Sequence, residues 1–178
     1  TLAGFGEPLL HKKIKNYVQT LRNGVQLKQV KLITNGDYLN PKSAKILVDA
    51  GINCIKVSMY DDDMTDHFES FLSQYDIERV YKHYYDGLPE DVEVNRNEIW
   101  KDGKIIMKER TCYLPFYKMF VNWNGDVGLC SNDWNISQVF GNVNRDWIND
   151  IWESDYFKSF RNIMIKSNRI MNPCISCN

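Results

Sequence analysis

Apolar residues recur at helical spacing near the start of the chain. Residues 11–24, HKKIKNYVQTLRNG, place Ile14, Val18 and Leu21 on one face and end at Gly24. Glycine commonly follows or closes a helix because it tolerates the left-handed backbone found there. The pattern predicts an amphipathic helix that ends at Gly24.

After this helix, the sequence predicts two short strands on either side of a second helix. Residues 29–36, QVKLITNG, form a β-rich run that ends in a turn. Residues 40–51, NPKSAKILVDAG, begin with Asn40 as a predicted N-cap, continue with proline at the first helical position and end at Gly51. Residues 54–60, CIKVSMY, are typical of another buried strand.

Strands that alternate with helices at this spacing predict parallel strands with right-handed crossovers. If residues 1–6 close a further strand, three strands end in small or polar residues, at 4–8, 34–36 and 58–61. Taken singly, each cluster is more simply a turn. In a parallel barrel, however, the active site is built at the carboxyl ends of the strands, and three such ends in register favour a site.

The next segments predict one more helix and one more strand before a weakly patterned region. Residues 66–74 read as a short helix, and residues 77–86 have the β-branched and aromatic content of a strand, although a helix is also possible. Asp102-Gly103 lies between two apolar runs and predicts a hairpin.

Composition excludes several classes of protein. The chain has 178 residues, 43% of them hydrophobic, which is enough for one domain or somewhat more. A net charge of −1 gives no electrostatic footprint for nucleic acid or an acidic membrane surface. No apolar run approaches the ~20 residues that span a bilayer. Nothing resembles a secretory signal, and we expect a cytoplasmic protein.

Cysteines cluster toward the end of the sequence. The chain has five, an odd number that argues against a disulfide framework, and four lie after residue 111. Asn124-Gly125 predicts a hairpin that can return Cys130 toward Cys112. Cys174 and Cys177 form a Cys-x-x-Cys pair. Four thiolates suit either zinc or an iron–sulfur cluster, and the spacing does not separate the two. Cys54 is expected to stay apart as a small buried hydrophobe.

Between the hairpin and the last two cysteines, residues 141–169 predict one or two amphipathic helices. Their apolar side chains are available for a core: Trp147, Ile151, Trp152, Phe157, Phe160 and Met164.

The motifs GFGEPLLH, ITNG and GINCIKVSMYD resemble the core of the radical S-adenosylmethionine enzymes, with Phe5 where that family has a glycine. The resemblance implies an α/β fold, a partial parallel (β/α)6 barrel. It also implies that the glycine-glutamate-proline turn takes up the methionine amino group and that the next two strand ends line the cofactor pocket. The implied cofactor-binding residues are Gly6, Glu7, Pro8, Thr34, Asn35, Gly36 and Ser58.

The family's Cys-xxx-Cys-xx-Cys loop, which holds a radical-generating 4Fe-4S cluster, is not among the 178 residues. The chain opens on Thr1, and we expect that loop upstream of it, so that the barrel here lacks its first strand. The rival interpretation is a degenerate relative that never had the loop.

The C-terminal motifs resemble the SPASM or "twitch" extension of these enzymes. The resemblance rests on the cysteine spacing with Gly125, on Gly-Asn-Val at 141–143, on Ile-Trp-x-Ser at 151–154 and on Arg161. It implies a partial core of a radical S-adenosylmethionine enzyme over residues 1–108 and a small α+β SPASM or twitch domain over residues 109–178. The implied ligands of one auxiliary 4Fe-4S cluster are Cys112, Cys130, Cys174 and Cys177.

The resemblance predicts the C-terminal part of an oxidoreductase that uses a 5′-deoxyadenosyl radical from S-adenosylmethionine to abstract hydrogen. The implied partners are a peptide, protein or carbohydrate substrate and an external electron donor of the flavodoxin or ferredoxin type, with no membrane and no nucleic acid. We assign no catalytic residue and expect these residues alone to be inactive. The alternative is a non-enzymatic zinc-binding module that uses the same four cysteines.

Overall fold

The structure is a computed structural model, and it describes residues 1–3, 6–60, 62–83, 111–131, 133, 135–166 and 174. The chain divides into two compact units, Thr1–Pro89 and Glu90–Asn178, which are described separately below. The predicted boundary at residue 108 and the predicted hairpin at Asp102-Gly103 lie outside the described residues.

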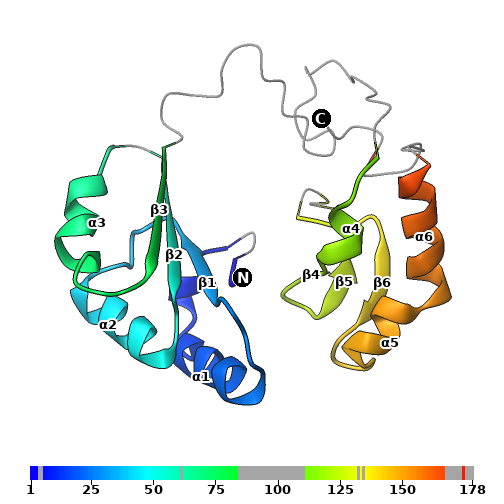
Figure 1. Cartoon of the computed structure of the whole chain (residues 1–178), viewed down its shortest axis with the longest axis horizontal. Helices are drawn as coiled ribbons and strands as arrows, with labels where there is room; N and C mark the ends of the chain where they lie inside the picture. Colours follow the sequence, from blue (N-terminus) through cyan, green and yellow to red (C-terminus); the bar gives the residue numbers. More distant parts are fainter. Residues whose placement is uncertain are drawn as a thin grey trace, which may run out of the picture. The chain divides into compact units, whose positions relative to one another are not determined.

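The N-terminal unit is a three-stranded parallel sheet in the order β1-β2-β3. Leu2 adds a parallel bridge to Leu32 on the far side of β1, as the sequence predicted for residues 1–6. Figure 1 shows α1, α2 and α3 together on one face of this sheet. The elements, in chain order, are η1 (Pro8–Leu10), α1 (Ile14–Gly24), β1 (Lys31–Thr34), α2 (Pro41–Ala50), β2 (Cys54–Met59), α3 (Thr65–Leu72) and β3 (Glu78–His83).

Local chemistry defines the limits of α2. The side chain of Asn40 accepts hydrogen bonds from the backbone amides of Lys42 and Ser43, and Pro41 occupies the first helical position. The helix ends at Gly51, whose φ of 113° is the left-handed conformation that glycine adopts without strain. Both predicted ends of this helix are therefore confirmed.

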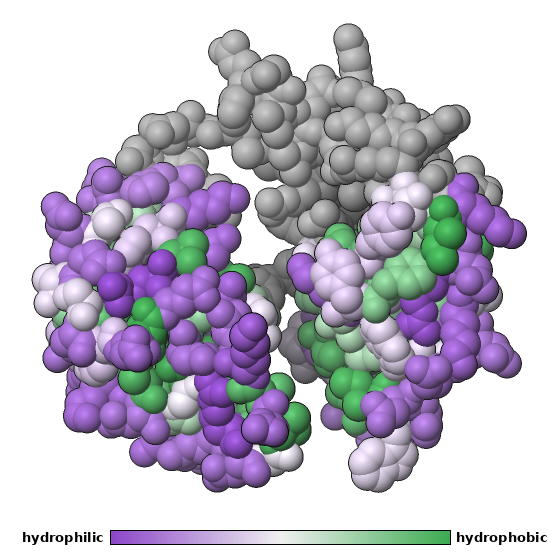
Figure 2. Space-filling view, in the orientation of Figure 1, coloured by the Kyte–Doolittle hydropathy of each residue, from purple (hydrophilic) through white to green (hydrophobic). Residues whose placement is uncertain are grey.

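Side chains on the helix-covered face form the core of the unit. Leu32, Ile55 and Val57 are completely buried there, together with Val18 of α1 and Leu47 of α2. Hydrophilic residues dominate the visible outer surface of the same unit in Figure 2, with apolar residues scattered between them. This division between an apolar interior and a hydrated surface provides the main stabilisation of the sheet against its helices.

The apolar face predicted for α1 is only partly buried. Leu21 is 37% exposed, while the neighbouring Arg22 turns inward and donates hydrogen bonds to the carbonyls of Gly51 at 2.6 Å and Leu27 at 2.7 Å. The carbonyl of Gly51 closes the end of α2 and that of Leu27 lies in the loop after α1, and a long guanidinium side chain reaches both.

The C-terminal unit is an antiparallel sheet in the order β4-β5-β6 with helices beside it (Figure 1). The predicted hairpin at Asn124-Gly125 joins β4 to β5, and Gly125 has a φ of 88°. The predicted helical segment after Gly141 forms two helices, α5 and α6. The elements are α4 (Leu114–Tyr117), β4 (Phe120–Val121), β5 (Asp126–Gly128), β6 (Val139–Asn142), α5 (Ile148–Glu153) and α6 (Asp155–Ile165).

Aromatic stacking forms the core of this unit. The rings of Phe140 on β6 and Phe157 on α6 stack with their centroids 4.1 Å apart, and Phe160 meets Phe140 edge-on. Met164 is fully buried in the same cluster. The prediction of Trp147 as a core residue is wrong, because it precedes α5 as an extended N-cap residue and is 81% exposed.

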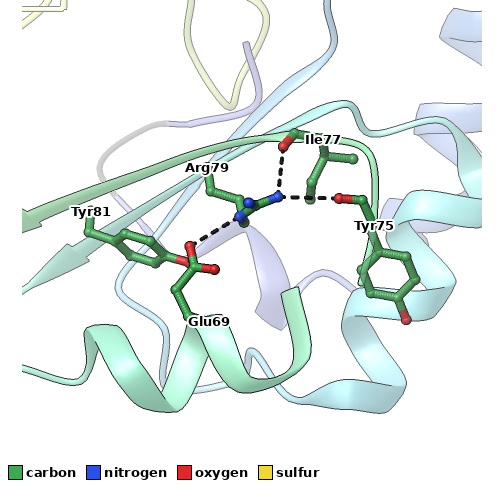
Figure 3. Close-up of polar contacts among 5 residues, drawn as sticks. All are labelled: Glu69, Tyr75, Ile77, Arg79 and Tyr81. Carbon is green, nitrogen blue, oxygen red and sulfur yellow. Dashed lines mark hydrogen bonds and ion pairs between the residues drawn. The ribbon is translucent and has the colours of Figure 1, made fainter. Parts of the chain in front are cut away.

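A hydrogen-bonded staple joins α3 to β3 (Figure 3). Oε1 of Glu69 accepts hydrogen bonds from Arg79 Nε at 3.0 Å and from the Tyr81 hydroxyl at 2.8 Å. The guanidinium of Arg79 also donates to the carbonyls of Tyr75 and Ile77, each at 3.2 Å. The staple fixes β3 at the edge of the described sheet.

Acidification is expected to weaken this staple. The pKa of Glu69 lies below its ordinary value, chiefly because the Tyr81 hydroxyl donates a hydrogen bond to the carboxylate. Burial raises this pKa, and Arg79 lowers it further. A depressed folded-state pKa gives stability that is present above the ordinary glutamate pKa of about 4.3 and is lost as pH falls through the folded value. Glu69→Gln keeps an acceptor oxygen but removes the titration.

Thermal unfolding at pH values from about 6 down to about 3 will test this effect. Wild-type protein should lose stability more steeply than Glu69→Gln over that range. Parallel profiles for the two proteins would show that the charge of Glu69 does not stabilise the edge of the sheet.

Candidate functional site

A cavity of about 320 Å³ lies at the carboxyl ends of the parallel strands. The turn before η1 provides one wall, and the ends of β1 and β2 provide the others. Its lining residues are Ala3, Gly6, Glu7, Ile33, Thr34, Asn35, Ser58 and Tyr60. The structure thus brings three predicted strand ends to one cavity, which is where ligands bind in open parallel sheets.

Glu7 ties two of these strand ends together. Its Oε1 accepts hydrogen bonds from the backbone amide of Leu9 at 2.9 Å and from the hydroxyl of Thr34 at 2.8 Å. Its Oε2 accepts a hydrogen bond from the backbone amide of Asn35 at 2.9 Å. A carboxylate offers about four acceptor positions, so these three bonds leave Oε2 with room for one further donor. Glu7 therefore holds the turn before η1 and the end of β1 together in the cavity wall.

Ser58 contributes a hydroxyl to the cavity wall. It lies near the end of β2 and is 6% exposed. Among the residues that the structure describes, no group forms a hydrogen bond with its hydroxyl, although Ser58 lines the cavity. The hydroxyl lies at the cavity wall, where it is available to a ligand atom.

Two predicted cofactor-binding residues do not line the cavity but determine the backbone around it. Pro8 starts η1 and does not line the cavity. Gly36 has a φ of 93° and lies against the helix-covered side, where an added Cβ would come within 2.6 Å of the Phe68 ring and 3.1 Å of Val57. Both residues set the path of the backbone at the strand ends.

The predicted cofactor-binding residues omit three lining residues, Ala3, Ile33 and Tyr60, although Tyr60 belongs to the predicted strand-end cluster at 58–61. Ile33 lies on β1 between the buried residues Leu32 and Thr34, so the period of two in a strand places it on the opposite face, away from the helices. That period, applied once the strand direction is known, would have found Ile33.

Three of the four predicted cluster ligands contact one core. Cys174 is 8% exposed within the C-terminal core, and Cys112 and Cys130 pack against that same core. The thiol of Cys174 lies 3.8 Å from the thioether sulfur of buried Met164. Cys177 lies outside the described residues. Within the described part of the chain, no three His, Cys, Asp or Glu side chains are grouped closely enough to hold a metal ion, so convergence of the four thiols stays a prediction.

Cys54 occupies a different environment, as predicted. It begins β2 in the N-terminal unit and is completely buried. Burial raises the pKa of the Cys54 thiol, Lys31 opposes this shift, and Glu78 adds to it. A thiol held in its protonated form is a poor metal ligand, since metals bind the thiolate.

The fold and the C-terminal motifs define the class of protein. Residues 112–178 match the SPASM family, an iron–sulfur cluster-binding domain. Almost the whole chain is also homologous to the S-adenosylmethionine-dependent dehydrogenase named next, so the chain is similar over its length to a radical S-adenosylmethionine enzyme with a SPASM domain. The cofactors of this class are S-adenosylmethionine and 4Fe-4S clusters.

One similar protein is the S-adenosyl-L-methionine-dependent 2-deoxy-scyllo-inosamine dehydrogenase of Niallia circulans. It is 28% identical over 176 residues, which cover 98% of this chain and 70% of that protein. The crystal structure of BtrN in complex with AdoMet and 2-DOIA has a TM-score of 0.82 at 28% identity, covering 98% of this chain and 70% of BtrN. BtrN in an open conformation has a TM-score of 0.74 at 24% identity, covers 98% of this chain and 68% of that one, and shares the fold.

Proposed function

We propose that this chain provides the S-adenosylmethionine pocket wall and the auxiliary-cluster domain of an oxidoreductase that oxidises a hydroxyl group of a carbohydrate or cyclitol. The observation that carries the proposal is the cavity at the carboxyl ends of β1 and β2, with the Ser58 hydroxyl, which bonds to no described residue, in its wall. The substrate class rests on the Niallia circulans dehydrogenase, whose named substrate is an aminocyclitol.

The cavity fits S-adenosylmethionine in its chemistry. The Oε2 atom of Glu7 retains one acceptor position for an ammonium group, and Gly6 has no side chain, so its backbone can approach a ligand closely. Ser58 offers a hydroxyl that can donate to a ligand carboxylate. When bound and reduced, this cofactor supplies a 5′-deoxyadenosyl radical that abstracts hydrogen from the substrate.

The C-terminal unit fits an iron–sulfur cluster in its donor set. Cys112, Cys130, Cys174 and Cys177 would hold one 4Fe-4S cluster, which would accept an electron released by substrate oxidation. The buried core around Cys174 would exclude water from the cluster. An external electron donor of the flavodoxin or ferredoxin type would supply the electron that cleaves S-adenosylmethionine, and an electron acceptor of the same type would take up the electron that the substrate leaves on the auxiliary cluster. None of the described helices is long and apolar enough to cross a membrane.

Ligand binding to the intact chain can be measured by NMR even at millimolar affinity. S-adenosylmethionine should shift the backbone amide signals of Gly6, Asn35 and Ser58 while leaving those of α1 unchanged. Ser58→Ala removes one donor to a charged group, worth about 1–1.5 kcal/mol, and should weaken binding about 5- to 10-fold.

The matched control is Ser70→Ala, which removes an exposed hydroxyl on α3 that, among the described residues, bonds to the carbonyl of His67 alone. It should leave the affinity unchanged. Shifts scattered over both units, or equal weakening by the two substitutions, would contradict the assignment of the cavity.

A further inference from the structure

The loop between β5 and β6 contains a completely buried carboxylate, that of Asp133. It is the only acidic residue in the described part of the chain that is buried, with an exposed fraction of 0%. Its Oδ1 accepts hydrogen bonds from the amide of Ser137 at 2.9 Å and from the Ser137 hydroxyl at 2.8 Å, and its Oδ2 accepts one from the amide of Gln138 at 3.2 Å. A buried charge is costly unless fixed donors replace water, and here three donors do so.

The same residue is bonded directly to a predicted cluster ligand. The backbone amide of Asp133 donates to the carbonyl of Cys130 at 3.2 Å, which closes a turn that starts at that cysteine. The amide of Ile136 in turn donates to the carbonyl of Asp133 at 3.1 Å. One carboxylate therefore joins the turn after Cys130 to the start of β6.

This loop holds an unfavourable backbone conformation. Ile136 has a φ of 47°, the only positive φ of a non-glycine residue in the described part of the chain. A β-branched residue rarely adopts this conformation unless the surrounding structure imposes it. The bonds from Ser137 and Gln138 to Asp133 span Ile136, so they provide that constraint.

We propose that Asp133 is a positioning residue for the auxiliary cluster. It fixes the direction in which Cys130 presents its thiolate, and its buried negative charge lowers the reduction potential of the cluster. The inference rests on the proposed assignment of Cys130 as a ligand. A nearby negative charge in a low-dielectric interior opposes the addition of an electron, and charge and hydrogen bonding around iron–sulfur clusters set their potentials.

The test replaces the charge while keeping the shape. In Asp133→Asn, the side-chain oxygen can still accept both bonds from Ser137, but the amide group faces the Gln138 donor and the charge is gone. The matched control is Asp150→Asn, which removes the same charge from the exposed first turn of α5. Each protein is prepared as the full chain and reconstituted anaerobically with iron and sulfide. Its midpoint potential is then measured by redox titration followed by electron paramagnetic resonance.

Asp133→Asn should shift the midpoint potential of the cluster to a more positive value and change its g values, whereas Asp150→Asn should leave both unchanged. A fall in thermal stability with the potential and g values of wild type would overturn the proposal and leave Asp133 as a loop anchor alone.

A second variant covers the case in which Asp133→Asn retains no cluster. Ser137→Ala removes one hydrogen bond to the carboxylate and keeps its charge, so the charge is less compensated and the potential should shift in the negative direction. An unchanged or more positive potential would contradict the proposal. If wild-type protein holds no iron–sulfur cluster, the proposed function fails. If it holds one and both variants match it in potential, the inference about Asp133 alone fails.

Discussion

Gly36→Ala is expected to destabilise the N-terminal unit by roughly 2–4 kcal/mol and to abolish the shifts that S-adenosylmethionine causes at the strand ends. Gly36 has a φ of 93°, and its missing Cβ would lie 2.6 Å from the Phe68 ring. Alanine is therefore strained twice, by its backbone conformation and by overlap with a buried aromatic side chain. Relief requires movement of the turn that presents Thr34 and Asn35 to the cavity.

The matched control is Gly24→Ala at the end of α1. No heavy atom lies within 4 Å of the Cβ that this change would add. Removing a flexible glycine from a helix should be neutral or stabilise by about 0.5–1 kcal/mol. Denaturant unfolding monitored by NMR of β1 and β2 amides would report both effects. Equal stability of the two variants would show that the turn at Gly36 is not constrained as described.

Cys174→Ser is expected to remove the iron–sulfur cluster and to unfold much of the C-terminal unit. The thiol lies among Phe157, Phe160 and Met164, and the sheet of this unit has strands of only two to four residues. Small domains of this kind commonly gain much of their folding free energy from a bound metal centre. A serine hydroxyl at this buried position binds iron poorly.

Cys54→Ala serves as the control, because that thiol is buried in the N-terminal unit. It should leave the iron content unchanged. Retention of the full iron content by Cys174→Ser, or loss of iron from Cys54→Ala, would contradict the ligand assignment. Iron analysis and circular dichroism of the three proteins would provide the comparison.

Local signals predicted the alternating strands and helices of the N-terminal unit. Asn40, Pro41 and Gly51 act within one helix, so their effects are visible in a short window of sequence. Gly125 likewise determines a hairpin turn through its own backbone. The strand–helix repeat then placed the polar strand ends at one cavity, because parallel strands share the direction of their carboxyl ends.

Residues that act across the chain escaped prediction. Arg22 turns inward to donate to a carbonyl 29 residues away, which no local pattern indicates. The carboxylate of Glu7 was predicted to meet a ligand, but three donors from η1 and the end of β1 engage it first. Such side-chain bonds depend on tertiary contacts and leave no periodic signal.

The buried loop after Cys130 shows the same limit. Asp133 lies in a segment without helix or strand periodicity, where an acidic residue reads as part of a hydrated turn. Its burial follows from the pairing of β5 with β6, which brings the amides of Ser137 and Gln138 to its carboxylate. The functional role proposed for it could therefore emerge only from the structure.

The most direct test of the central claim is the metal content of wild-type protein after anaerobic reconstitution with iron, sulfide and zinc together. One auxiliary cluster held by Cys112, Cys130, Cys174 and Cys177 predicts about four iron and four sulfide per chain, with the Mössbauer spectrum of a 4Fe-4S centre. One zinc per chain without iron or sulfide would contradict the claim and establish a structural zinc site on the same four cysteines.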